Sequence, residues 1–95
     1  MPVAPSPELV LSRSDRLSWR VLDDEALILH PEAGTLHRLN GTGTRFWELL
    51  DGSRSIAVIA GALVEEYEVT CDDAIAQLQG LARELLDADL VEAKG

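Results

Sequence analysis

Two histidines are the side chains of this 95-residue chain best suited to hold a metal ion. His30 and His37 stand on either side of Pro31–Gly34, and a turn there would place both imidazoles on one side of a hairpin. Two such ligands, with no nearby cysteine and no third histidine, make a weak metal site. We therefore expect solvated strand histidines and predict that the protein holds no metal.

The other reactive groups are scattered along the chain. Cys71 is the single cysteine, which excludes an internal disulfide and indicates a small, semi-buried side chain in a reducing compartment. The segment Asn40–Gly43 lacks the lysine of a phosphate-binding loop. Acidic residues such as Glu65, Glu66 and Glu68 fall on polar helix faces or in turns and are expected to be solvated. Because no nucleophile, base and oxyanion donors come together, the sequence predicts a protein that is not an enzyme and needs no cofactor.

The first 40 residues have the pattern of short strands. Apolar residues alternate with polar ones, or form short runs, in LVLS, LSWRVL, ALILH and TLHRL. Charged residues at 23–25 form one turn, and Pro31–Gly34 forms the next, with Gly34 free to take positive φ. This order predicts antiparallel hairpins. Residues 1–8 include three prolines and are expected to form a flexible tail before a single domain over residues 9–93.

After Asn40 the apolar period becomes helical. Three helices are expected: RFWELL, capped by Thr42 or Thr44 and ended by Asp51-Gly52; IAVIAGALVEEY, capped by Ser55; and about Cys71 to Asp87, capped by Thr70. Leu90-Val91 would then close the domain. The predicted fold class is α+β.

The third helix has a wide apolar face. At 100° per residue, an arc of roughly 140° is filled by Ala74, Ile75, Leu78, Leu81, Ala82, Leu85 and Leu86. One border of this arc continues through Gln79 to Arg83, so apolar and hydrogen-bonding groups meet there. Two interpretations stay open: the border forms a groove, or Leu86 simply completes a small core.

The charge of the chain argues against several partners. Seventeen acidic and eight basic residues give a net charge of −9, and the isoelectric point is about 4.4. Such a field repels phosphate backbones and anionic lipid headgroups. The chain also lacks a secretory signal and any apolar run near the roughly 20 residues that span a bilayer. We expect a cytoplasmic protein that binds neither nucleic acid nor membranes.

A hairpin followed by helices also admits a winged-helix DNA-binding regulator, with the third helix in the major groove. That helix begins with Thr70-Cys-Asp-Asp-Ala, and Arg83 is its only basic residue. Helices that read DNA present Lys, Arg, Asn or Gln near their N-terminal end. DNA binding is therefore kept only as the alternative function.

A strand edge beside an apolar helix border can instead accept an extended peptide as an added strand. The segments that carry this arrangement are VLDDEALILHPEAGTLHRLN, TGTRFWELLDG, SIAVIAGALVEEYEV and AIAQLQGLARELLDADLV. In order and spacing they resemble the PqqD family of peptide chaperones, also called RiPP recognition elements, over about residues 9–93. The most telling pieces are Leu29-His-Pro-Glu32, Leu39-Asn40, Leu49-Leu-Asp-Gly52 and Leu90-Val91.

The resemblance implies a winged-helix-like domain in which a three-stranded antiparallel sheet is followed by three helices. In this family the leader of a ribosomally synthesised precursor peptide adds beside the third sheet strand and packs against the third helix. Carried onto this sequence, the implied peptide-binding residues are Thr35, Leu36, His37, Arg38, Leu39, Gln79, Ala82, Arg83 and Leu86. The further partner would be a maturation enzyme, either a radical SAM protein of pyrroloquinoline quinone biosynthesis or a leader peptidase of lasso-peptide processing.

Three questions stay open. Arg38 and Arg83 suit an acidic leader, or each pairs with an acid of its own domain. The open strand edge could also pair two copies into a homodimer. The buried face of the hairpin is either the one with Leu27, Leu29, Leu36 and Arg38 or the one with Ala26, Ile28, Leu39 and the two histidines.

Overall fold

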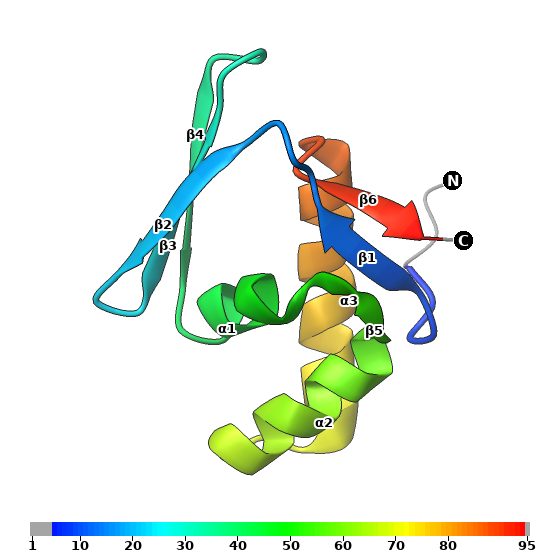
Figure 1. The fold of residues 1–95 in the computed structure, drawn as a ribbon. Coiled ribbons are helices and arrows are strands. Elements are labelled where there is room, and N and C mark those ends of the chain that lie inside the picture. Colours follow the sequence, from blue (N-terminus) through cyan, green and yellow to red (C-terminus); the bar gives the residue numbers. More distant parts are fainter. Residues whose placement is uncertain (1–4, 95) are drawn as a thin grey trace.

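A computed structural model describes residues 5–94 of the chain (Figure 1), so part of the predicted tail, residues 1–4, lies outside the described residues. Six strands and three helices follow one another: β1 (Val10–Arg13), β2 (Ser18–Leu22), β3 (Glu25–His30), β4 (Thr35–Asn40), α1 (Thr42–Leu49), β5 (Asp51–Ser55), α2 (Ile56–Glu66), α3 (Cys71–Asp87) and β6 (Val91–Lys94). The predicted α+β class, with a three-stranded antiparallel sheet followed by three helices, is confirmed.

The first sheet is an antiparallel meander in the order β2-β3-β4. β2 and β3 are joined by Asp23 and Asp24, whose φ angles of 51° and 63° are those of a two-residue turn that matches the twist of a hairpin. The next turn ends at Gly34 with φ of 68°, as its position predicts. Both hairpins follow directly from the alternation and turn residues of the sequence.

The second sheet has the order β5-β1-β6, so strands from the beginning, the middle and the end of the domain lie side by side in it. β1, the predicted LVLS strand, pairs with β5 on one side and with β6 on the other. Neither partner was predicted as a strand, because DGSRS is polar throughout and VEAK is only four residues long. Figure 1 shows β1 and β6 lying together beside one end of α3.

Two of the three predicted helix caps are confirmed. Ser55 accepts a hydrogen bond from the N–H of Val58 at 3.1 Å, and Thr70 accepts one from Asp73 at 3.2 Å. The prediction for α1 is wrong: its N-cap is Gly41, which makes no side-chain hydrogen bond. Thr42 and Thr44, the two threonines expected as alternative caps, both lie inside the helix.

The core lies between the first sheet and the helices. The α1 residues Phe46 and Trp47 are fully buried at its centre, and Figure 1 shows α1 between the hairpins and α3. Other members come from both sheets and both longer helices, among them Leu11, Ile28, Ile59, Leu63, Leu78, Leu85 and Val91. One continuous core therefore fixes the position of the hairpins relative to α3.

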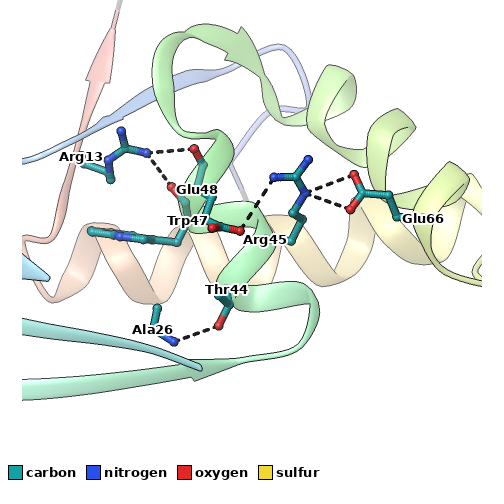
Figure 2. A network of polar contacts seen from close by, with 7 residues as sticks. All are labelled: Arg13, Ala26, Thr44, Arg45, Trp47, Glu48 and Glu66. Carbon is teal, nitrogen blue, oxygen red and sulfur yellow. Dashed lines mark hydrogen bonds and ion pairs between the residues drawn. The ribbon is translucent and has the colours of Figure 1, made fainter. Parts of the chain in front are cut away.

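Arg13 joins the two sheets through the end of α1. Its Nη1 donates hydrogen bonds to the carbonyls of Trp47 (2.8 Å) and Glu48 (3.1 Å), as Figure 2 shows. These carbonyls lie in the last turn of the helix, where a cation is favourable. The same guanidinium lies 5.0 Å from the ring of Trp19 in β2, and that ring packs edge-on against Trp47.

A second arginine joins α1 to α2. Arg45 Nε donates to both carboxylate oxygens of Glu66, at 2.9 and 3.1 Å, and the pair is drawn in Figure 2. This hydrogen bonding raises the pKa of Arg45 above its usual value. Because both side chains are partly exposed, the pair fixes the relative orientation of the helices more than it stabilises the fold.

Candidate functional site

The outer edge of β4 is open, because no described strand pairs with it. The two-residue turn closes on the pair Leu22–Glu25, which is a hydrogen-bonded pair in hairpins of this kind. Because the direction of the backbone groups alternates along a strand, the N–H and C=O groups of Ala26 and of the other even-numbered residues of β3 point toward β4. In β4 the backbone N–H and C=O groups of Leu36 and Arg38 consequently point away from β3. They form an unpaired row that can bind another strand.

The inner face of the first sheet is the one that carries the histidines. Ala26, Ile28 and His30 are buried, while Leu29 and Leu36 on the other face are exposed. This settles which face belongs to the core. On β4 the inward side chains are those paired with the buried residues of β3, namely Thr35, His37 and Leu39.

Thr44 attaches one end of β4 to α1. Its hydroxyl accepts a hydrogen bond from the N–H of Ala26 at 3.0 Å and donates one to the carbonyl of Leu39 at 2.9 Å. Ala26 and Leu39 face each other in the ladder, so the hydroxyl lies between the two strands (Figure 2 shows its bond to Ala26). The sequence offered Thr44 as a helix cap and gave no signal for this buried relay.

Leu81 forms the part of α3 that faces β4. A Cβ added at Gly43 would lie 3.5 Å from Leu81 Cδ2 and 3.6 Å from Leu39 Cβ. Both distances are ordinary van der Waals contacts, so the start of α1 lies next to the strand on one side and the helix on the other. Leu39 and Leu81 are both half-buried and pack against the core. They give the space between β4 and α3 an apolar lining.

The α3 residues that were predicted to bind the peptide do not lie on the same side of the helix as Leu81. Gln79 is about 160° from Leu81 around the axis, and its amide donates to the carbonyl of Pro5 at 2.8 Å. Ala82 is fully buried in the core and has no surface to offer a ligand. Leu86 is half-buried against the core, on the same side as Gln79.

The structure thus brings Thr35, Leu36, His37, Arg38 and Leu39 together along one strand and does not bring Gln79 or Ala82 to it. The helical wheel shows two borders of the apolar face but not which one meets the sheet. Leu81, which the wheel placed at the other border and which was not among the predicted residues, is the α3 residue that lies near Gly43 and Leu39. Its only signal was its place in the apolar arc.

The two basic residues expected to receive an acidic leader already have acidic neighbours. Arg38 Nε lies 3.0 Å from Glu25 Oε1, and Arg83 Nε lies 3.8 Å from Asp87 Oδ2. Internal pairing, which was one of the two interpretations left open, is confirmed. Among the arginines of residues 5–94, Arg20 is the one whose side chain has neither an ion pair nor a hydrogen bond.

The outer face of the first sheet is apolar and hollowed. A cavity of about 280 Å³ is lined by Ser18, Trp19, Arg20, Leu27, Leu29 and Leu36. Leu36 is 65% exposed, Leu29 is 44% exposed, and Leu22 on the same face is 52% exposed. A small domain rarely leaves so many large aliphatic side chains on one face without a partner. The inner face of this sheet packs against the core, and its outer face can therefore contact a partner.

The side chains that could hold a metal do not gather into a site, because within residues 5–94 no three side chains of histidine, cysteine or acid come together. His30 is buried, contrary to the expected solvated side chain, whereas His37 is half-buried with Nε2 3.0 Å from Thr35 Oγ1. Cys71 is exposed rather than semi-buried. Among the described helices, none is long and apolar enough to cross a membrane.

Two solved structures share this fold. One is described as TbiB1 in complex with the TbiA(beta) leader peptide; it superposes with a TM-score of 0.80 and 30% identity over 88% of this chain and 98% of that chain. The other is described as lasso peptide synthetase B1 complexed with the leader peptide, with a TM-score of 0.77 and 24% identity over 86% and 96% of the chains. The second likeness shows the fold alone.

Sequence comparison gives the same relationship. The PqqA binding protein of Klebsiella pneumoniae (strain 342) is 36% identical over 55 residues, which is 58% of this chain and 58% of that relative. The match thus spans less than two thirds of the relative's length. The family described as coenzyme PQQ synthesis protein D matches residues 25–91, more than half of the chain. This chain belongs to the PqqD family.

Proposed function

We propose that this protein is a non-enzymatic peptide chaperone, which binds the leader of a ribosomally synthesised precursor peptide as an added strand on β4 and delivers it to a maturation enzyme. The observation that carries this proposal is the unpaired row of backbone groups on β4, with the apolar side of α3 next to it. The names of the related proteins support it, because one of them is a complex with a leader peptide and another is a PqqA binding protein.

The proposed complex uses backbone and side chains differently. The N–H and C=O groups of Leu36 and Arg38 form hydrogen bonds with the leader backbone. Because every peptide has the same backbone groups, these bonds do not select a particular leader sequence. The leader side chains that point inward contact Leu39, Leu81 and His37, and these contacts select apolar residues. Of the residues predicted from the sequence we keep Thr35–Leu39 as peptide contacts, and on α3 we propose Leu81 in place of Gln79, Ala82, Arg83 and Leu86.

Calorimetric titration tests the proposal. The ligand is the leader part of the precursor peptide encoded beside this protein's gene, and the matched control is a peptide with the same residues in scrambled order. We expect saturable one-to-one binding of the leader and at least tenfold weaker binding of the control, about 1.4 kcal/mol. Equal binding of the two peptides, or none by either, contradicts the proposal.

For the maturation enzyme we propose a separate surface, the hollowed outer face of the first sheet. Its large aliphatic side chains and the cation of Arg20 fit an apolar partner segment that carries carboxylates. Since Leu29 points away from the core, Leu29→Glu is expected to leave leader binding unchanged and to slow maturation by the enzyme encoded with the precursor. Unimpaired maturation by this variant contradicts the assignment of that face.

DNA binding is not supported. The first turn of α3 carries Asp72 and Asp73, so this helix would bring negative charge to the major groove. A gel-shift experiment at low salt is expected to show no retardation of duplex DNA. Pairing of two copies through β4 would use the same edge as the leader, so light scattering is expected to show that added leader dissociates any dimer.

A further inference from the structure

His30 is a buried polar side chain at the point where β3 turns into β4. It is 4% exposed, and Thr44 is the other buried polar residue among those described. His30 Nδ1 accepts a hydrogen bond from the N–H of Ala33 at 3.3 Å, inside the turn. A ring nitrogen that accepts carries no hydrogen, so in the neutral imidazole the hydrogen is on Nε2.

The other ring nitrogen of His30 faces Asp89. The distance from Nε2 to Asp89 Oδ2 is 3.5 Å. Asp89 lies in the turn between α3 and β6, and its φ of 62° is in the left-handed region, which glycine adopts without strain. Its own N–H donates to the carbonyl of Leu86 at 3.1 Å. The chain thus places a carboxylate at a position whose backbone favours glycine, and that carboxylate points to the histidine.

This contact spans the two sides of the proposed peptide site. His30 is the ladder partner of Thr35, the first residue of β4, while Asp89 follows the end of α3. At the other end of β4, the Thr44 hydroxyl holds the carbonyl of Leu39, and Leu39 meets Leu81 across Gly43. The strand is therefore fastened to the helical layer at both of its ends.

We infer that His30 and Asp89 are positioning residues, which hold the start of β4 at the distance from α3 that one added strand requires. The inference rests on the proposed function. The imidazole N–H and the carboxylate act at the end of the site, so they set its width without contacting the leader's apolar side chains. When the contact is lost, the edge of β4 stays open but its separation from Leu81 is no longer fixed, and the leader binds less tightly.

Asp89→Gly separates this role from a purely structural one. Glycine takes a φ of 62° without strain, so the unfolding temperature is expected to stay equal or to rise. Affinity for the leader is expected to fall by about two- to fivefold, which corresponds to about 0.4–1 kcal/mol and lies within the range of an exposed charged contact. A residue with only a structural role would change stability and affinity in the same direction.

Two further variants sharpen the test. Asp89→Asn keeps an oxygen facing Nε2 and tolerates the left-handed backbone, so it is expected to bind the leader nearly as well as the wild type. Asp87→Asn removes a carboxylate two residues away, which pairs with Arg83 instead, and is expected to change nothing in leader binding. Nitrogen-detected NMR of the wild type is expected to show His30 with its hydrogen on Nε2.

The outcomes distinguish the two proposals. If the wild type does not bind the leader, the proposed function fails. If the wild type binds and Asp89→Gly binds equally well, only the positioning role is overturned. It is also overturned if Asp89→Gly lowers the unfolding temperature and the affinity together, or if Asp89→Asn is as weak as Asp89→Gly.

Discussion

The two borders of the apolar face of α3 look alike in sequence and differ in what covers them. Gln79 marks the border that the chain covers itself, through its bond to Pro5 and the nearby bond from the N–H of Ala57 to the carbonyl of Pro7. Leu81 marks the border that faces β4, where the sheet edge is open. An apolar border of this helix is thus free to meet a partner only where no segment of its own chain covers it.

The difference between the two borders is tested most strongly by placing a charge on each border in turn. Leu81→Glu puts a carboxylate where the leader's apolar side chains are proposed to pack, and is expected to weaken leader binding by a factor of about 100 or more, since desolvating an unpaired charge costs several kcal/mol. Gln79→Glu is expected to leave binding within about twofold of wild type. Calorimetric titration of both variants measures the contrast, and circular dichroism verifies that each is folded.

Equal loss of binding in these two variants would contradict the assignment of the open border to Leu81. Leu81→Ala serves as the milder change if Leu81→Glu does not fold. It removes apolar contact without adding charge and is expected to cost about tenfold in affinity, within the range for removing several buried methyl groups.

A proline on the edge strand tests the backbone part of the site. Arg38→Pro removes an N–H that points away from β3, so the sheet itself loses no hydrogen bond, as is usual for prolines on sheet edges. Leader affinity is expected to drop by about tenfold, from one lost hydrogen bond and the changed edge. Arg38→Ala keeps the N–H and is the control. If both variants bind alike in a fluorescence titration, the backbone of residue 38 does not bond to the leader.

The Thr44 relay tests whether the open strand must be held in place. Thr44→Val keeps the shape of the side chain but leaves the N–H of Ala26 and the carbonyl of Leu39 without their partner. The free energy of unfolding is expected to fall by about 1–3 kcal/mol. Urea denaturation measures this loss, and Thr42→Val, outside the relay, is the control. A Thr44→Val protein as stable as wild type would show that the buried hydroxyl is dispensable.

The smallest expected effect lies far from the peptide site, at the start of β5. Hydrogen bonds from Ser53 lower the pKa of Asp51 below its usual value, helped by Arg54. A lowered folded-state pKa adds stability above the pKa of the unfolded carboxyl, about 3.9. This contribution is lost as the pH falls through the folded pKa. Asp51→Asn is expected to lose less stability than wild type between about pH 4 and pH 2 in acid titrations followed by circular dichroism.

The hairpins could be predicted because their signals are local. Alternating residues in LSWRVL and a Pro-to-Gly turn before TLHRL define strands that pair with their neighbours in sequence. The second sheet could not be predicted in the same way. DGSRS has no alternation, and its partner β1 lies about 40 residues earlier, so only the closed core makes it a strand.

The candidate site shows the same division. The open strand Thr35–Asn40 was found from sequence because an edge and its turn are local features. The border of α3 that lies near β4 could not be chosen from the sequence, because the wheel gives angles around one axis and not the position of the sheet. The roles of Thr44 and His30 depend on partners 18 and 59 residues away, at Ala26 and Asp89, which no local pattern indicates.

Amide hydrogen exchange of β4, followed by NMR with and without the leader, tests strand addition most directly. In the free protein the N–H of His37 is bonded to β3 and is expected to exchange slowly, whereas those of Leu36 and Arg38 face solvent and exchange fast. Adding saturating leader is predicted to slow the exchange of Leu36 and Arg38 and to leave His37 unchanged. A bound leader that leaves Leu36 and Arg38 exchanging fast would contradict docking on β4.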